Sequence, residues 1–152
     1  MNITKDIVKK QILEVLEETF ERSHGIYLDK NTSLFETIDT IPYEKVGKSF
    51  HAIPETIAGH VNHVIFYIVV LKEYITGKRT GKTDWNESWK VKEVRKEEWE
   101  ELKKRLREEY KNLKEFVEEI DKWENEDYLG GSIAMIAHCA FHLGIIRQLK
   151  DF

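Results

Sequence analysis

The stretch "KEEWEELKKRLREEYKNLKEFVEEI", residues 96–120, decides the class of the fold. Its apolar residues recur every three or four positions, which is the spacing of one face of an α-helix. They are Trp99, Leu102, Leu106, Leu113, Val117 and Ile120. Most of the positions between them are Lys, Arg or Glu. We therefore predict an amphipathic helix that packs this stripe against a core and turns a charged back to water.

Three other segments have helical patterns, and none shows the period-two alternation of a strand. Residues 4–25 carry one apolar stripe and end at Gly25, a residue type that commonly follows a helix. Residues 54–77 place Pro54 at a first helical position and end at a second glycine. We expect the last helix to open at "GGS", residues 130–132.

Residues 26–53 separate the first two of these helices and predict a long, partly irregular connection with one or two short helical turns. A chain of 152 residues buries enough surface for one core, roughly 68–70% of what its unfolded form exposes. We predict an all-α protein, a four-helix bundle, with a single domain over residues 1–152.

The composition indicates which partners the protein does not bind and which cellular compartment suits it. The net charge is −4, and the 24 basic and 28 acidic side chains are interleaved, which argues against a nucleic-acid-binding face. Cys139 is the only cysteine, so an internal disulfide is excluded and a reducing compartment fits. Charges interrupt the apolar residues near the start of the sequence, so no secretory segment is expected there. We predict a soluble, cytoplasmic protein.

The second and fourth helices lack charge over long runs, from Thr56 to Leu71 and from Tyr128 to Ile146. A membrane span needs about 20 apolar residues. We reject that interpretation because both runs contain histidines, glycines and polar residues, and the first run is short. A helix that is apolar on every side is otherwise buried on every side. We therefore predict a homodimer through these two helices, favoured by the small residues Ala137, Ala140 and Gly144.

His138 and His142 stand in the uncharged stretch "IAMIAHCAFHLGII", residues 133–146. Four residues apart on a helix, they lie about 40° apart around the axis and about 6 Å apart along it. Both imidazoles therefore share a face, as in paired-histidine metal motifs. A shared divalent ion would satisfy two buried rings at once. The alternative is a pair of core histidines that bond carbonyl or hydroxyl groups.

The second helix supplies two candidates for a third ligand. Relative to an apolar stripe centred on Ile57 and Val64, His60 lies about 60° off centre and His63 about 120° off. His63 is therefore expected nearer the flank, and it is the alternative third ligand. Three imidazoles with open positions suit a catalytic rather than a structural divalent site. The predicted metal ligands are His60, His138 and His142.

The remaining candidates receive structural roles. Cys139 is turned about 60° or more from both paired histidines, so we interpret it as a packing thiol. Trp85 and Trp89 in "TDWNESW" are expected to pack over an exposed edge, with a place at the mouth of the site as the alternative. His24 and His51 are predicted surface residues. A di-iron carboxylate site is excluded because no glutamate stands three residues before the predicted ligands.

With these residues the chain resembles the DinB-like, YfiT-type four-helix bundles. The resemblance rests on the histidine in "IAGHVNHVIFY", the pair in "IAHCAFHLGIIRQL" and the loop "DWNESW". It implies three histidines that bind a divalent ion at one end of the bundle, most often nickel or zinc, with iron or manganese as further options. It also implies homodimers, and metal-dependent enzymes that act with low-molecular-weight thiols on small molecules.

Two classes of function follow. In the first, the ion activates a low-molecular-weight thiol or water for transfer or hydrolysis on a small molecule, with the histidines as ligands only. In the second, the chain is a non-catalytic dimeric bundle that binds metal for stability or sensing. No residue outside the three histidines shows the pattern of a general acid, base or nucleophile, so the sequence names no catalytic residue and no substrate.

Overall fold

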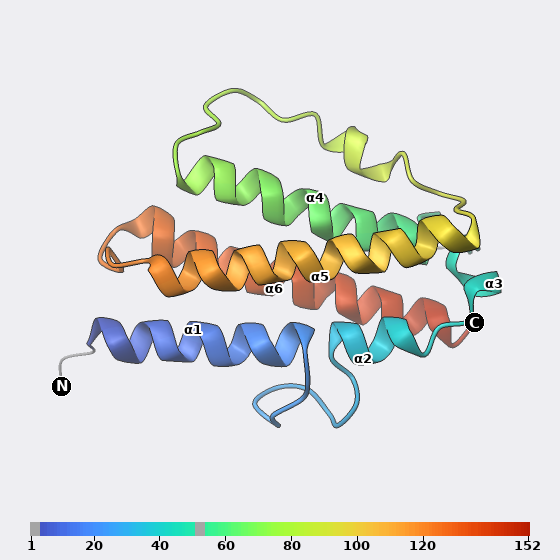
Figure 1. Cartoon of the computed structure of the whole chain (residues 1–152), viewed down its shortest axis with the longest axis horizontal. Coiled ribbons are helices and arrows are strands. Elements are labelled where there is room, and N and C mark those ends of the chain that lie inside the picture. The colour runs from blue at the N-terminus through green and yellow to red at the C-terminus, as the bar shows by residue number, and fades with distance from the viewer. Residues whose placement is uncertain (1–3, 51–53) are drawn as a thin grey trace.

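The computed structural model describes residues 4–50 and 54–152, and every regular element within these ranges is a helix. In chain order the elements are α1 (Lys5–Phe20), α2 (Leu34–Asp39), α3 (Tyr43–Val46), α4 (Ile57–Ile75), η1 (Trp85–Trp89), α5 (Lys96–Glu119) and α6 (Glu126–Lys150). Four of the helices, α1, α4, α5 and α6, are long, and they run side by side (Figure 1). Two short helices lie in the connection between the first two long ones, and a 3₁₀ turn lies between the second and third.

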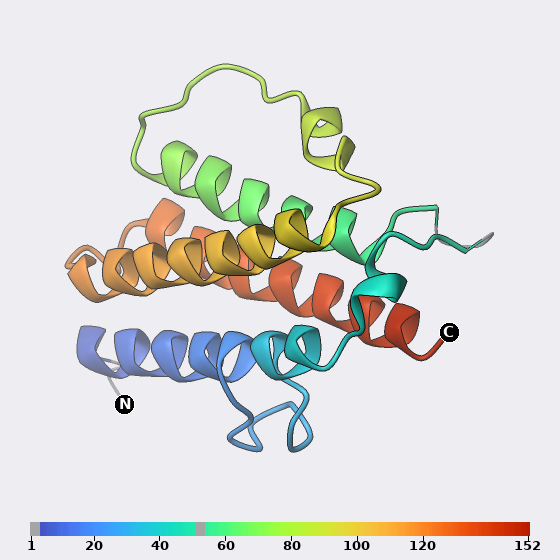
Figure 2. The same cartoon turned by 45° about the vertical axis from the view of Figure 1, so that its right-hand side comes forward.

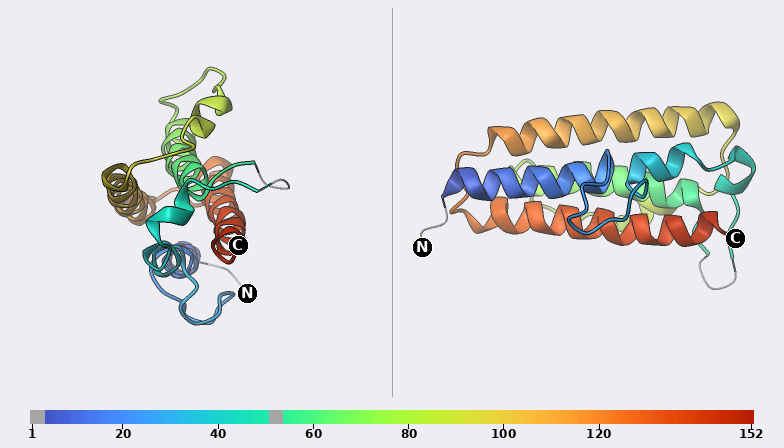
Figure 3. Two further views of the ribbon diagram at one scale, coloured as in Figure 1. Left: turned by 90° about the vertical axis from the view of Figure 1, so that its right-hand side faces the viewer. Right: turned by 90° about the horizontal axis from the view of Figure 1, so that it is seen from below.

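The long helices share one apolar core. α4 packs against α5 and α6, and α1 packs against the same two helices (Figure 3). The predicted stripe of α5 is buried along its whole length, as its periodicity indicates. The predicted irregular connection is also confirmed within the described residues, since it contains α2 and α3 joined by turns.

Three predicted helix boundaries are wrong. α1 ends at Phe20, and Gly25 (φ 80°) instead lies in the loop beyond it. α4 begins at Ile57 because the Thr56 side chain accepts a hydrogen bond from the Gly59 N–H, so Pro54 lies outside the helix.

α6 begins at Glu126, where the Asn125 side chain caps its first turn, so the glycines expected to open it lie inside it. Gly131 has a packing role there, since an added Cβ would come within 2.3 Å of Ile75 Cδ1. The missing side chain lets α6 approach the end of α4.

The segment between α4 and α5 lies on the outer side of α4 (Figure 2) and brings η1 into contact with that helix. Gly59 permits the approach, because a Cβ there would come within 2.9 Å of the Val91 carbonyl oxygen. As a result no residue of α4 is exposed, although its first fifteen residues carry no charge.

α6 differs from α4 in presenting apolar side chains to solvent. Ile133 is 53% exposed and Phe141 is 64% exposed, and Ala137 lies exposed between them. Among the described residues, α6 is also the one helix whose length and hydropathy would suffice for a membrane span, as those of core helices in soluble proteins often do. The exclusion of a membrane span therefore stays a prediction.

A buried carboxylate organises the loop after α1. Glu18 is fully buried, and its carboxylate accepts hydrogen bonds of 2.8 to 3.2 Å from the backbone N–H groups of five consecutive residues, 24–28. Burial by itself would raise the pKa of this carboxyl, but the backbone donors outweigh it and hold the pKa below its ordinary 4.5.

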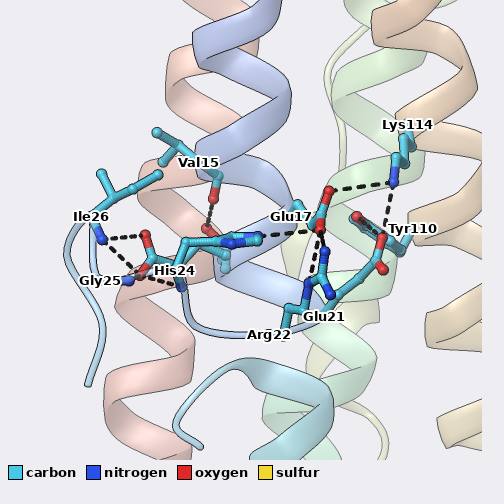
Figure 4. Close-up of polar contacts among 11 residues, drawn as sticks. Val15, Glu17, Glu21, Arg22, His24, Gly25, Ile26, Tyr110 and Lys114 are labelled. Atoms are coloured by element: carbon cyan, nitrogen blue, oxygen red, sulfur yellow. Dashed lines mark hydrogen bonds and ion pairs between the residues drawn. The ribbon is translucent and has the colours of Figure 1, made fainter. Parts of the chain in front are cut away.

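Close to this loop, Glu21 accepts hydrogen bonds from the Tyr110 hydroxyl and the Lys114 ammonium group, which ties the end of α1 to α5 (Figure 4). The same view shows the Gly25 and Ile26 amides turned toward α1. Two carboxylates therefore fix the start of the long connection: Glu18 binds the backbone of the loop, and Glu21 binds side chains of α5.

Candidate metal centre

Four histidines meet between α4 and α6. The two helices run in opposite directions (Figure 1), so a residue further along α4 faces one earlier in α6. His60 lies opposite His142, with 3.0 Å between their Nδ1 atoms. His63 lies opposite His138, with 3.0 Å between their Nε2 atoms. The sequence prediction that the paired histidines of the last helix share a face toward the second helix is confirmed.

Three of the four form a group suited to one ion. His63, His138 and His142 each offer a ring nitrogen, and these nitrogens lie within 4.8 Å of one another. His60 is outside this group but adjoins it through His142. The assignment of His60 as the third ligand stays a prediction, and the geometry supplies the competing assignment in which His63 takes that place.

His63 does not lie toward the flank as the ideal helix angles suggest. It is only 6% exposed, because η1 covers the side of α4 on which it stands. Its Nδ1 is 2.6 Å from the Ser88 hydroxyl oxygen, and its ring stacks on Trp89 with 4.0 Å between centroids and 12° between planes. The angular prediction failed because it considered one helix and its apolar stripe, and not a loop folded back onto that helix.

The two loop tryptophans therefore do more than cover an edge. Trp89 contacts the histidine cluster directly, and Trp85, 40% exposed, lies 6.4 Å from His63 between ring centroids. Both tryptophans lie beside the histidine cluster, and their predicted place at the mouth of a site stays a prediction. Ser88 was missed by sequence reasoning, since a serine in a polar loop carries no signal of its own.

The histidines differ in access to solvent. His60, His63 and His142 are buried, whereas His138 is half-buried and stacks on Tyr67 at 3.6 Å between centroids. The Nε2 atom of His60 is buried and has no hydrogen-bond partner in the described structure. A buried imidazole nitrogen without a partner costs on the order of 1–3 kcal/mol.

Burial keeps these rings neutral. It lowers the pKa of His63 to about 4, with the neighbouring His138 and His60 adding to the effect. Burial also lowers the pKa of His138 to about 4 and that of His142 to about 3. The pKa of His60 is lowered by burial as well, partly offset by Glu55. Neutral imidazoles are the form that binds metal ions, so no proton has to leave a charged ring at neutral pH.

The other candidates stay outside the cluster. Cys139 is fully buried, and burial raises the pKa of its thiol, which agrees with the predicted packing role. His24 is exposed and pairs with Glu17, as expected of a surface residue. His51 lies outside the described residues.

Comparisons with protein-family models, with curated proteins and with solved structures gave no match. The fold and the site together define an all-helical protein with a cluster of three histidines that could bind a metal ion.

Proposed function

We propose that the chain is a divalent-metal-binding four-helix bundle in which His63, His138 and His142 hold the ion. The observation that carries the proposal is the approach of three neutral ring nitrogens within 4.8 Å on two facing helices. Nitrogens bound to one zinc ion at about 2.0–2.1 Å must lie within roughly 4 Å of each other, so small ring movements suffice. His60 then bonds His142 from outside the site and orients it.

The three-histidine set favours a catalytic site over a structural one, because three protein ligands leave a position open for water or substrate. Zinc and nickel accept imidazole readily, and iron and manganese are less favoured options. The half-buried His138 marks the side from which a small molecule could reach the ion, and the exposed Trp85 and Phe141 lie beside the other two ligands, His63 and His142.

When bound, such an ion lowers the pKa of a coordinated thiol or water and so supplies a nucleophile at neutral pH. The chain's own residues would hold the ion, through the histidines, and exclude bulk water, through Trp89 and the buried α4 face. No carboxylate hydrogen-bonds to the four histidines in the described structure, so we assign no general acid or base. The resemblance to DinB-like bundles supports a low-molecular-weight thiol as the co-substrate and a small-molecule electrophile as the acceptor.

The competing function is a non-catalytic bundle that binds metal for stability or sensing. The close enclosure of three of the four histidines is the observation that favours it. Turnover of thiol and electrophile that depends on the added ion separates the two functions. A cytoplasmic location belongs to the same proposal, because a single fully buried thiol fits a reducing compartment.

We expect His63→Ala to lower zinc content to near zero in untagged protein and His60→Ala to leave most of it. The reason is that His63 offers its Nε2 directly to the group, whereas His60 reaches the group only through His142. Elemental analysis after zinc loading and dialysis measures the difference, with His24→Ala as the control for an exposed histidine.

In the opposite pattern, His60→Ala would contain almost no zinc and His63→Ala would contain as much as wild type. That result would restore His60 as the third ligand. Equal zinc content in all of these variants and in wild type would count against a metal site here.

We propose further that two chains associate through α6. α4 has no exposed residue, because other elements of the same chain cover its uncharged surface. α6, in contrast, leaves Ile133, Ala137 and Phe141 exposed. Light scattering should give a mass twice 18.1 kDa at micromolar concentration, and Ile133→Glu should halve it. Ile7→Glu, on α1, is the matched control, since Ile7 is 52% exposed and Ile133 53%. A wild-type mass near that of one chain refutes the dimer.

A further inference from the structure

The 3₁₀ turn η1 makes a polar contact with the histidine cluster through Ser88. This residue is fully buried, and its hydroxyl oxygen lies 2.6 Å from His63 Nδ1. The same oxygen lies 2.6 Å from the backbone carbonyl oxygen of Trp85. One hydroxyl group therefore stands between an imidazole nitrogen and a carbonyl oxygen, both within hydrogen-bond distance.

The positions of the protons follow from which atoms can donate. A carbonyl oxygen only accepts, and a serine hydroxyl has a single proton, so that proton must point at Trp85. Otherwise two oxygens carrying lone pairs would face each other at 2.6 Å in a buried place. The 2.6 Å contact between the Ser88 hydroxyl oxygen and His63 Nδ1 also needs a proton. Since the serine proton is already used, His63 Nδ1 must donate it. The Nε2 atom of a neutral His63 then carries the free lone pair.

That lone pair lies on the side of the ring where the cluster is. His63 Nε2 is the atom 3.0 Å from His138 Nε2. Metal-bound histidines in general donate their other ring N–H to a neighbouring acceptor, which fixes both the tautomer and the ring orientation. Ser88 occupies the place of such an acceptor.

We propose that Ser88 is a positioning residue that holds His63 in its Nδ1–H tautomer and presents its Nε2 lone pair to the ion, an inference that rests on the proposed function. Two neighbours keep the contact in place. Trp89 stacks on the ring and restricts its rotation, and the Asn62 side chain donates a hydrogen bond of 2.7 Å to the Ser88 carbonyl oxygen. η1, which covers α4, thereby also sets the tautomer of His63.

The tautomer can be measured without any metal. Two-bond ¹H–¹⁵N spectra of the metal-free protein near neutral pH distinguish a protonated from an unprotonated ring nitrogen. We expect His63 to show its proton on Nδ1 in wild type and in Ser88→Thr, which keeps the hydroxyl. In Ser88→Ala the proton should shift wholly or partly to Nε2. Ser132→Ala removes another buried serine hydroxyl, on α6, and should leave the His63 signals unchanged.

Zinc titration of the same proteins gives the second readout. Ser88→Ala should bind zinc about 10- to 100-fold more weakly than wild type, which is the usual effect of losing such a partner. Ser88→Thr and Ser132→Ala should stay within a few-fold of wild type. A role of Ser88 in folding alone would lower thermal stability and leave the tautomer and the zinc affinity in place.

The outcomes separate the two proposals. A wild-type His63 that carries its proton on Nε2 overturns the role of Ser88 whatever the protein binds. Wild-type zinc affinity in Ser88→Ala overturns it as well. A wild-type protein that binds no zinc overturns the proposed function, and with it the role of Ser88 toward an ion, even where the spectrum shows the expected tautomer.

Discussion

His142→Ala is expected to weaken zinc binding by more than about 100-fold, because loss of an outer partner alone costs about 10- to 100-fold and this change removes a ligand. His142 belongs to the group with His63 and His138, and it is also the residue that His60 contacts. It is thus a ligand in both assignments of the third histidine. The expected result therefore does not depend on which assignment is correct.

The measurement combines zinc titration with thermal unfolding. A ligand that binds only the folded state at 100 times its Kd raises the free energy of unfolding by about 2.7 kcal/mol. Wild type should show this gain, and His142→Ala should show none at the same zinc concentration. Without zinc, the circular dichroism of the variant should remain helical, since the helices are held by apolar packing that His142→Ala leaves intact.

His24→Ala is the control, because this exposed histidine pairs only with Glu17 and should bind zinc as wild type does. If His142→Ala keeps wild-type zinc affinity and loses only stability, the histidines are core residues and no metal site exists between α4 and α6.

Glu18→Gln should lower the free energy of unfolding by roughly 2–4 kcal/mol, the range for breaking a buried, charge-assisted network. The carboxylate of Glu18 is acceptor for five consecutive backbone N–H groups, and a glutamine amide offers one oxygen and a donor that faces them. Several of these backbone N–H groups would lose their partner. Chemical denaturation at neutral pH measures the change.

Glu14→Gln is the matched control on the same helix. Its side chain is 43% exposed and pairs only with its neighbours Lys10 and Gln11, so the free energy should move by no more than about 0.5 kcal/mol. Equal effects of the two substitutions would show that the Glu18 carboxylate does not organise the loop.

The same residue predicts a pH dependence. The pKa of folded Glu18 is lowered from 4.5, so the unfolded chain binds the proton more readily than the folded one. The stabilisation is therefore fully present above pH 4.5 and is lost as the pH falls through the lowered folded value. Wild type should lose stability more steeply below pH 4.5 than Glu18→Gln, and parallel curves would contradict the assignment.

Much of the fold is predictable because helical periodicity is a local property. The stripe from Trp99 to Ile120 alone places α5 and its buried face, and the structure buries every residue of that stripe. The spacing of His138 and His142 likewise fixes their common face, since four residues make slightly more than one turn. Helix ends were harder, because caps such as Thr56 and Asn125 compete with prolines and glycines nearby for the boundary.

The neighbours of each helix were decided only in the tertiary structure. Periodicity gives the angle between two side chains on one helix, but it does not say which helix or loop lies across from them. The opposite directions of α4 and α6 set His63 beside His138, and the return of η1 over α4 buried His63 against Ser88 and Trp89. The sequence by itself determined that four long helices form and that His138 and His142 share one face. The partner of that pair on α4 depends on long-range packing, which no local spacing encodes.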